Sequence, residues 1–399
     1  MALPTPPDPA KNPATALPGY ALWNLGFRPF YLLAGLFATL SVPAWMAQYA
    51  GWLGGHAIIA GPLWHAHEML FGYALAVIVG FLFTAGRNWA NQPTPTGAAL
   101  AAIAALWVAA RLLVLAHYAF AAAVFDTAFA LAAAAGIALP FVRSGNRRNY
   151  FFVALLIGMG LANLAFHLGM AGLLDLPVQR GLQAGLDLVL FIMVVMSGRV
   201  IPMFTMNGIP GVFCARLPWI ERLAPGSILA LLAADVLGAP DMLIGPIAAV
   251  AAAAHAARLG LWRPWLTLKK PIVWILHFAY AWIVLALALR AFAAFDLVPP
   301  GLAIHALTVG AIGGLTLGMM TRTSLGHTGR PLQTGRAELF CYVTIQLAAL
   351  IRVFLPLAIP SLYLHAIIGS GLLWSLAFGV FTVSYWPILS RPRLDGKPG

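Results

Sequence analysis

The sequence predicts an all-α, polytopic integral membrane protein with about twelve transmembrane helices. Of its 399 residues, 62% are hydrophobic and only 9% are charged, and the mean hydropathy is +0.89. The apolar residues gather in repeated stretches of about 20, the length of helix that crosses a hydrocarbon core roughly 30 Å thick. Because lipid offers backbone groups no hydrogen-bond partner, these stretches are expected to be helices.

A single membrane domain is expected at residues 23–390, between two short tails. Residues 1–22 are rich in proline and have no apolar segment after a basic start, which predicts a disordered cytoplasmic tail and not a signal peptide. Residues 391–399 form the second cytoplasmic tail. The expected spans are approximately 27–49, 62–86, 97–116, 119–142, 150–173, 181–206, 225–239, 241–260, 271–295, 301–323, 337–358 and 361–388.

Three kinds of residue distinguish particular spans. Pro43 and Pro202 lie inside the first and sixth spans, where membrane helices tolerate kinks. The seventh span is the weakest, because it is short and contains Asp235. The tenth carries small residues at four-residue steps, a stripe that predicts close packing against a neighbouring helix: Gly310, Gly314 and Gly318.

The positions of lysine and arginine predict the orientation of the spans. With the N-terminus placed in the cytoplasm, all but four of the 23 basic residues fall on the cytoplasmic side. The exceptions are Arg180 and, within helices near the outer side, Arg111, Arg290 and Arg352. Both termini are therefore expected to be cytoplasmic. The basic residues that give the formal net charge of +12 lie between the apolar spans, beside the lipid bilayer. The charge therefore indicates no nucleic-acid partner.

Histidines fall at a common depth near the outer side. The stretch "GPLWHAHEMLFGY" opens the second span and places His65 and His67 one turn below the outer surface. His305 lies at the same depth on the tenth span, and His167 lies toward the outer end of the fifth. Neutral imidazole is a common ligand of haem iron and copper, so a metal site is expected in this layer. For any single histidine, a helix-to-helix hydrogen bond is the alternative.

The spacing of His65 and His67 predicts two separate sites. On a regular helix, side chains at i and i+2 point about 200° apart, so the two imidazoles cannot bind one metal. Glu68 lies about 60° from His65 and is expected to orient that imidazole or to carry protons beside it. A satisfied histidine–glutamate pair is the alternative.

Charged residues within the other spans have two interpretations each. Arg111, Arg290 and Arg352 either bind haem propionates, since arginine binds carboxylates bidentately, or extend to the lipid headgroups. Asp187 and Asp235 are candidates for proton transfer or for a structural ion pair.

Two further histidines are expected on the inner side. His277 lies at the start of the ninth span, and His327 lies in the loop after the tenth. They either form a second cofactor site or stabilise the loop by hydrogen bonds.

Several kinds of chemistry are excluded. Cys214 and Cys341 are isolated and belong to no CxxC or CxxCH motif, which argues against a disulfide framework, an iron–sulfur cluster and covalent c-type haem. The glycine motifs of nucleotide-dependent enzymes are missing from the sequence, so ATP-driven or dehydrogenase chemistry has no support.

Blocks from near the N-terminus to the last residue resemble the NnrS family. They are "LWNLGFRPFYLLAG", "GPLWHAHEMLFGYALAVIVGFLFTA", "SGRVIPMFTMNG", "HALTVGAIGGLTLGMMTRTSLGHTGRPL" and "RPRLDGKPG". That family comprises haem- and copper-containing inner-membrane proteins of bacteria associated with nitric oxide metabolism and nitrosative stress. The resemblance implies non-covalent b-type haem and copper as cofactors, and an inner-membrane location.

The resemblance also implies the metal ligands. The family's histidine positions correspond to His65, His67, His277, His305 and His327, and His167 is added for its depth. "WHAHE" is expected to supply one axial haem ligand, with His305 as its partner, and the other histidine of the pair is available to copper. Which of His65 and His67 binds iron is left open. Glu68 is the expected catalytic residue, in proton transfer.

The expected function is to bind or consume nitric oxide at the haem. Reduction of nitric oxide would draw electrons from quinol or from a separate electron-donor protein. Two alternatives remain: a nitric oxide sensor without turnover, and a proton-coupled transporter, since twelve spans with both termini inside is also a transporter layout. An internal repeat would favour transport, but the sequence shows no convincing one.

Overall fold

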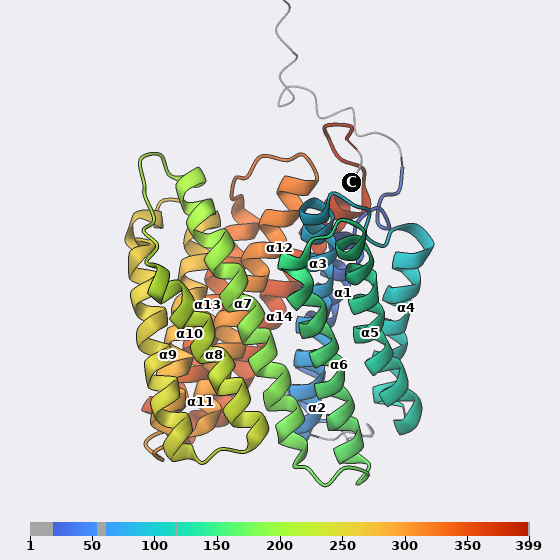
Figure 1. Ribbon diagram of the computed structural model, residues 1–399. Coiled ribbons are helices and arrows are strands. Elements are labelled where there is room, and N and C mark those ends of the chain that lie inside the picture. Colours follow the sequence, from blue (N-terminus) through green and yellow to red (C-terminus); the bar gives the residue numbers. More distant parts are fainter. Residues whose placement is uncertain (1–18, 54–60, 117, 398–399) are drawn as a thin grey trace, which may run out of the picture.

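The chain folds into a bundle of long helices that run side by side (Figure 1). The computed structural model describes residues 19–53, 61–116 and 118–397. This part of the chain is 81% helical and contains no strand, which confirms the predicted all-α polytopic fold. The expected N-terminal tail lies outside the described residues as far as residue 18.

Twelve helices make up the described bundle when the two interrupted ones are each counted once. The first six are α1 (Phe27–Tyr49), α2 (Gly61–His67) continuing into α3 (Leu75–Ala90), α4 (Gly97–Leu115), α5 (Ala119–Arg143), α6 (Tyr150–Met170) and α7 (Val178–Gly208). The others are α8 (Pro218–Leu237), α9 (Asp241–Leu261), α10 (Pro271–Ala293), α11 (Pro300–His305) continuing into α12 (Gly314–His327), α13 (Arg336–Ala358) and α14 (Tyr363–Ser390).

Eleven of these helices are long and apolar enough to cross a membrane, and α8 is the twelfth. The helix α8 begins at Pro218, well before the expected start at 225. The first turn of α8 contains the charged residue Glu221, whose carboxylate pairs with Arg258 of α9 at 2.5 Å. This pairing allows the helix to start before the apolar stretch. Proline at the first helical position also suits a helix start, because its missing N–H would have no partner there.

The loops define two faces of the bundle. The terminal face carries the loops 91–96, 144–149, 209–217, 262–270 and 328–335 and the C-terminal segment 391–397, and the opposite face carries the loops 171–177, 238–240, 294–299 and 359–362 (Figure 1). The two ends of the described chain meet at the terminal face. There the N–H of Ala21 donates to the carbonyl of Ser390 at 2.8 Å, and Arg28 donates to the carbonyls of Leu389 and Arg391.

The glycine stripe of the tenth span packs against α10, as predicted. A Cβ atom added to Gly314 would lie 2.7 Å from the Cβ of Ala279, and one added to Gly310 would collide with the ring of Trp282. Glycine therefore lets the two backbones approach closely.

Two spans are interrupted by π-helical segments, Glu68–Ala74 between α2 and α3 and Ala306–Gly313 between α11 and α12. Each segment begins directly after a histidine, His67 in one case and His305 in the other. The two interrupted spans contact each other through the Tyr73 hydroxyl and Thr316 Oγ1, 2.5 Å apart. Single π turns are frequent at functional sites, because the extra residue alters which side chains face inward.

Candidate functional site

A cavity of about 390 Å³ lies between the two interrupted spans, α1, α7, α13 and α14. Its wall is mainly apolar, with Val42, Leu186, Ile312 and Ile367 among the lining residues. Polar groups are set into this wall, and they include His65, His305, Arg352 and Gln183. An apolar cavity with a few convergent polar groups is the usual form of a small-molecule or cofactor site.

His65 forms part of the cavity wall and is held by ring stacking. Its imidazole lies against the indole of Trp45, with ring centroids 4.0 Å apart and an angle of 18° between the planes. Its Nδ1 is buried and has no hydrogen-bond partner in the described structure. A buried polar atom without a partner is costly, at about 1–3 kcal/mol.

His305 reaches the same cavity from α11. Its Nδ1–H donates to the carbonyl of Gly301 at 2.6 Å, which leaves Nε2 as the acceptor. The Arg352 guanidinium donates to Nε2 at 3.2 Å and also lies near the hydroxyl of Tyr363 at 3.5 Å. The geometry thus keeps His305 neutral, with a lone pair directed toward a positive group, which is the form in which imidazole binds a metal.

His67 belongs to a different site, the buried polar cluster of His67, Glu68, Arg111, Asp126, Asn163 and His167. Each of these residues is at most 8% exposed. Nδ1 of His67 lies 2.9 Å from Glu68 Oε1, and Nε2 lies 2.9 Å from Asn163 Oδ1 and 3.1 Å from Asp126 Oδ2. The expected Glu68 contact is therefore made with His67 and not with His65.

Arg111 joins the two carboxylates of the buried polar cluster. It donates to Glu68 Oε1 at 2.6 Å and forms a close ion pair with Asp126. Two carboxylates and one guanidinium leave one negative charge uncompensated. Both nitrogens of His67 face oxygen atoms that accept, so an imidazolium would bring the cluster to neutrality.

Three residues of the cluster have their donor atoms close enough to share one metal ion. Ring nitrogens of His67 and His167 and a carboxylate oxygen of Asp126 all lie within 4.8 Å of one another. Nε2 of His167 is 3.3 Å from Asp126 Oδ2. Two imidazoles and one carboxylate suit a divalent transition metal such as copper, and a metal cation could replace the proton on His67.

The three membrane-embedded arginines lie in different surroundings. Arg352 lines the cavity. Arg111 is bound to the carboxylates of the buried polar cluster, and Arg290 is bound to Asp187 at 3.2 Å and, closely, to Asp235. Arg352 is thus the arginine of the three that stands beside the cavity histidines.

The two inner histidines lie near the terminal face with separate neighbours. Nε2 of His277 is 2.8 Å from Thr205 Oγ1, and its ring faces Trp262. His327 is the last residue of α12 and not part of the following loop, and its ring packs against Phe27 at 5.7 Å. In the described residues these two histidines share no hydrogen bond or ring contact.

Sequence reasoning missed Asp126, Asn163 and a further buried histidine, His255. Asp126 stands alone in the apolar stretch of α5, and a lone membrane carboxylate calls for a cationic partner, so this signal was present in the sequence. His255 forms hydrogen bonds with the Tyr280 hydroxyl at 2.5 Å and the Ala224 carbonyl at 3.1 Å, which satisfy both ring nitrogens.

A family model described as NnrS protein matches residues 21–393 of the chain. The matched range includes all twelve helices in full, and every residue of the cavity and of the buried polar cluster. No curated protein matches the chain.

Proposed function

Because the chain belongs to the NnrS family, we propose that it binds nitric oxide at a b-type haem in the cavity and carries copper in the buried polar cluster. Membership of this family fits a function related to nitric oxide. The observation that carries the proposal is the division of the histidines, with His65 and His305 on one cavity and His67 beside Asp126 and His167.

The cavity has the features that a haem requires. Apolar walls suit a porphyrin, and His65 and His305, which line the cavity from two different spans, are the residues that would hold it. A haem would take the place of Arg352 at Nε2 of His305, and the released guanidinium would suit a propionate. A bound haem would supply the iron at which nitric oxide binds.

The donor atoms of the buried polar cluster support the proposal of a copper site. His67, His167 and Asp126 are the proposed ligands. Glu68 positions His67 by accepting a hydrogen bond from its Nδ1–H, while Arg111 holds both carboxylates in place. Such supporting contacts fix the orientation of metal ligands.

Consumption of nitric oxide is the form of activity that we favour over sensing. Reduction of two nitric oxide molecules to nitrous oxide and water takes two electrons and two protons. Quinol or a separate electron-donor protein is the proposed source of electrons, and buried carboxyl groups near the cavity are the proposed source of protons. The protein would thereby protect the cell against nitrosative stress.

The proposed location is the inner membrane of a bacterium, with the terminal face in the cytoplasm. The basic loops support this orientation, since Arg147, Arg148, Lys269 and Lys270 lie at the terminal face whereas the opposite-face loops carry almost only acidic or neutral residues.

An absorption spectrum and a metal analysis of the purified protein test the proposal. We expect a Soret band that moves when nitric oxide is added, together with bound copper. Replacing His65 or His305 by alanine should remove haem, whereas Asp126→Asn and His167→Ala should lower copper and leave the haem spectrum in place. The matched control is His365→Ala, at an exposed position of α14, which should change neither. A colourless wild-type protein would contradict the proposal and favour a transporter.

A further inference from the structure

A second group of buried charges lies beside the cavity and has no part in the proposed ligand sets. Asp187 of α7 accepts hydrogen bonds at Oδ1 from Gln183 at 3.0 Å and from Arg290 at 3.2 Å. Arg290 also forms a close ion pair with Asp235 near the end of α8. We name Asp187 and Asp235 the carboxyl pair, and Arg290 is the cation that they share.

The charges of this group do not balance unless one carboxyl carries a proton. Two carboxylates face one guanidinium, and the Asp187 side chain is only 1% exposed. By contrast, Arg258 pairs with the single carboxylate of Glu221, and that ion pair is neutral without an added proton. A net buried negative charge is costly, so carboxyl pairs of this kind share a proton.

The position of that proton follows from the hydrogen bonds. Oδ1 of Asp187 is occupied by two donors, while Oδ2 is buried and has no partner in the described structure. Asp187 and Asp235 are joined through Arg290, which donates to both of them. A buried carboxylate oxygen without a donor is costly, so we place the shared proton on Oδ2 of Asp187.

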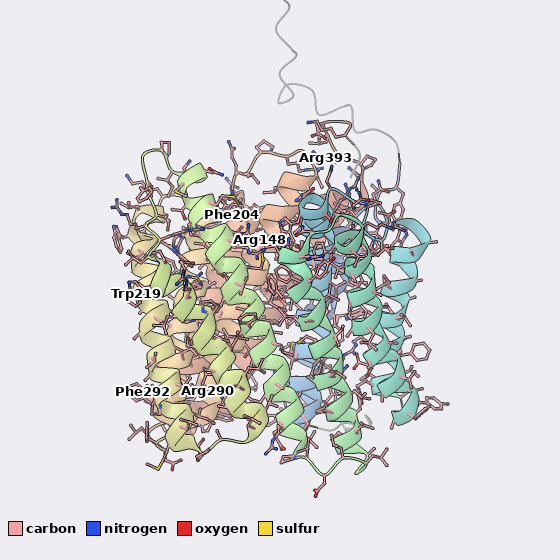
Figure 2. All side chains as sticks on the ribbon, viewed as in Figure 1. Arg148, Phe204, Trp219, Arg290, Phe292 and Arg393 are labelled. Atoms are coloured by element: carbon pink, nitrogen blue, oxygen red, sulfur yellow. The ribbon has the colours of Figure 1, made fainter. Side chains whose placement is uncertain are left out.

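The group extends from the opposite face of the bundle to the cavity. Side-chain exposure falls from 20% at Arg290 through 9% at Asp235 to 1% at Asp187. Arg290 lies toward the opposite face, far from Arg393 at the terminal face (Figure 2). At the inner end, Gln183 lines the cavity, so one hydrogen bond separates the Asp187 carboxyl from the cavity wall.

We propose that Asp235 and Asp187 form a proton relay from water at the opposite face to the cavity. Asp235 takes a proton from water, the proton passes to Asp187, and Asp187 releases it into the cavity beside Gln183. Arg290 remains cationic throughout and disfavours the state in which both carboxyl groups are protonated. The relay rests on the proposed function, because reduction of nitric oxide consumes protons in the cavity.

Infrared spectroscopy of the purified protein tests the shared proton without any need for turnover. We expect an absorption band of a protonated carboxylic acid that shifts in heavy water and is lost in Asp187→Asn. The matched control is Asp175→Asn in the exposed loop 171–177 of the same face, which should keep the band. A band that persists unchanged in Asp187→Asn would overturn the relay, whatever the protein does with nitric oxide.

Steady-state consumption of nitric oxide by protein in liposomes tests delivery to the cavity. Asp187→Asn and Gln183→Leu should each slow consumption at least tenfold, with haem content and the spectrum of the nitric oxide complex unchanged, and Asp187→Glu should restore most of the rate. Gln183→Leu should keep the infrared band, because it leaves the carboxyl pair intact. Wild-type rates in both variants would overturn the relay. A wild-type protein that consumes no nitric oxide would instead overturn the reduction, and the infrared result would still decide whether the pair holds a proton.

Discussion

His65 and His67 are two residues apart on α2 but belong to different sites. The ring of His65 stacks on Trp45 at the cavity wall, whereas the ring of His67 lies between Glu68 and Asp126 in the buried polar cluster. Little more than half a turn of helix therefore separates the two proposed cofactor sites.

Arg111 should be a main source of stability in the buried polar cluster. Replacing it by methionine leaves Glu68 and Asp126 buried without their cation, which should lower the free energy of unfolding by about 3–5 kcal/mol. Denaturant titration in detergent measures this loss. The matched change Arg143→Met, at an exposed position, should have little effect. Equal stability of both variants would show that the carboxylates are neutral in the folded protein.

Gly314 should tolerate no side chain. The Cβ of an alanine there would lie 2.7 Å from the Cβ of Ala279, so α10 and α12 would have to move apart. Crowding of this kind costs about 1–3 kcal/mol, which thermal unfolding in detergent can detect. Gly260→Ala is the control, because a Cβ atom at that position meets open space. A Gly314→Ala protein as stable as the control would argue against close packing of these helices.

Docking of the C-terminal segment should be insensitive to pH down to the acidic range. The hydrogen-bonded Arg393 guanidinium lowers the pKa of Asp395 well below its ordinary value of 3.8. A lowered pKa in the folded state stabilises the folded protein above the ordinary value, and this contribution is lost only as pH falls through the lowered value. Hydrogen exchange at the amide of Leu394, which donates to the Thr328 carbonyl, reports the docking. Protection should stay constant between about pH 8 and 5 and be weaker in Asp395→Asn throughout that interval. Protection that falls across that interval would contradict the pairing.

Cysteine labelling should establish the orientation. Ser144→Cys at the terminal face should react with a membrane-impermeant reagent only after the cells are opened, and Asp175→Cys should react in intact cells with a permeable outer membrane. Both wild-type cysteines, Cys214 and Cys341, are buried, so the background should be low. The reverse pattern would place the terminal face in the periplasm.

The spans were predictable because lipid imposes a simple requirement on composition. Apolar stretches of sufficient length could be read directly, and the confirmed fold follows from them. The start of α8 could not be predicted in this way, because the charged residues Glu221 and Arg222 are typical of a loop. Only the ion pair between Glu221 and Arg258 explains their place in a helix. That partner lies on another helix, and hydropathy along the chain carries no information about it.

The candidate site was predictable in its residues more than in its partners. Periodicity separated His65 from His67, but it assigned Glu68 to His65, whereas the hydrogen bond is made with His67. Asp126 joins the buried polar cluster through packing of α5 against the second span, a tertiary contact. The π segments were also unforeseen, since their sequences favour a helix and do not reveal its winding.

The π segment between α2 and α3 accommodates an extra residue in the chain. A π turn holds one residue more than an α-helix of the same rise requires. Deleting a single residue between 68 and 74 would therefore let an ordinary helix form while leaving α2 and α3 in nearly the same relative rotation. The change would fall on the segment itself, where one fewer side chain would be accommodated between His67 and Leu75. The extra residue thus alters which side chains of the segment face inward and leaves His65 in place at the cavity wall.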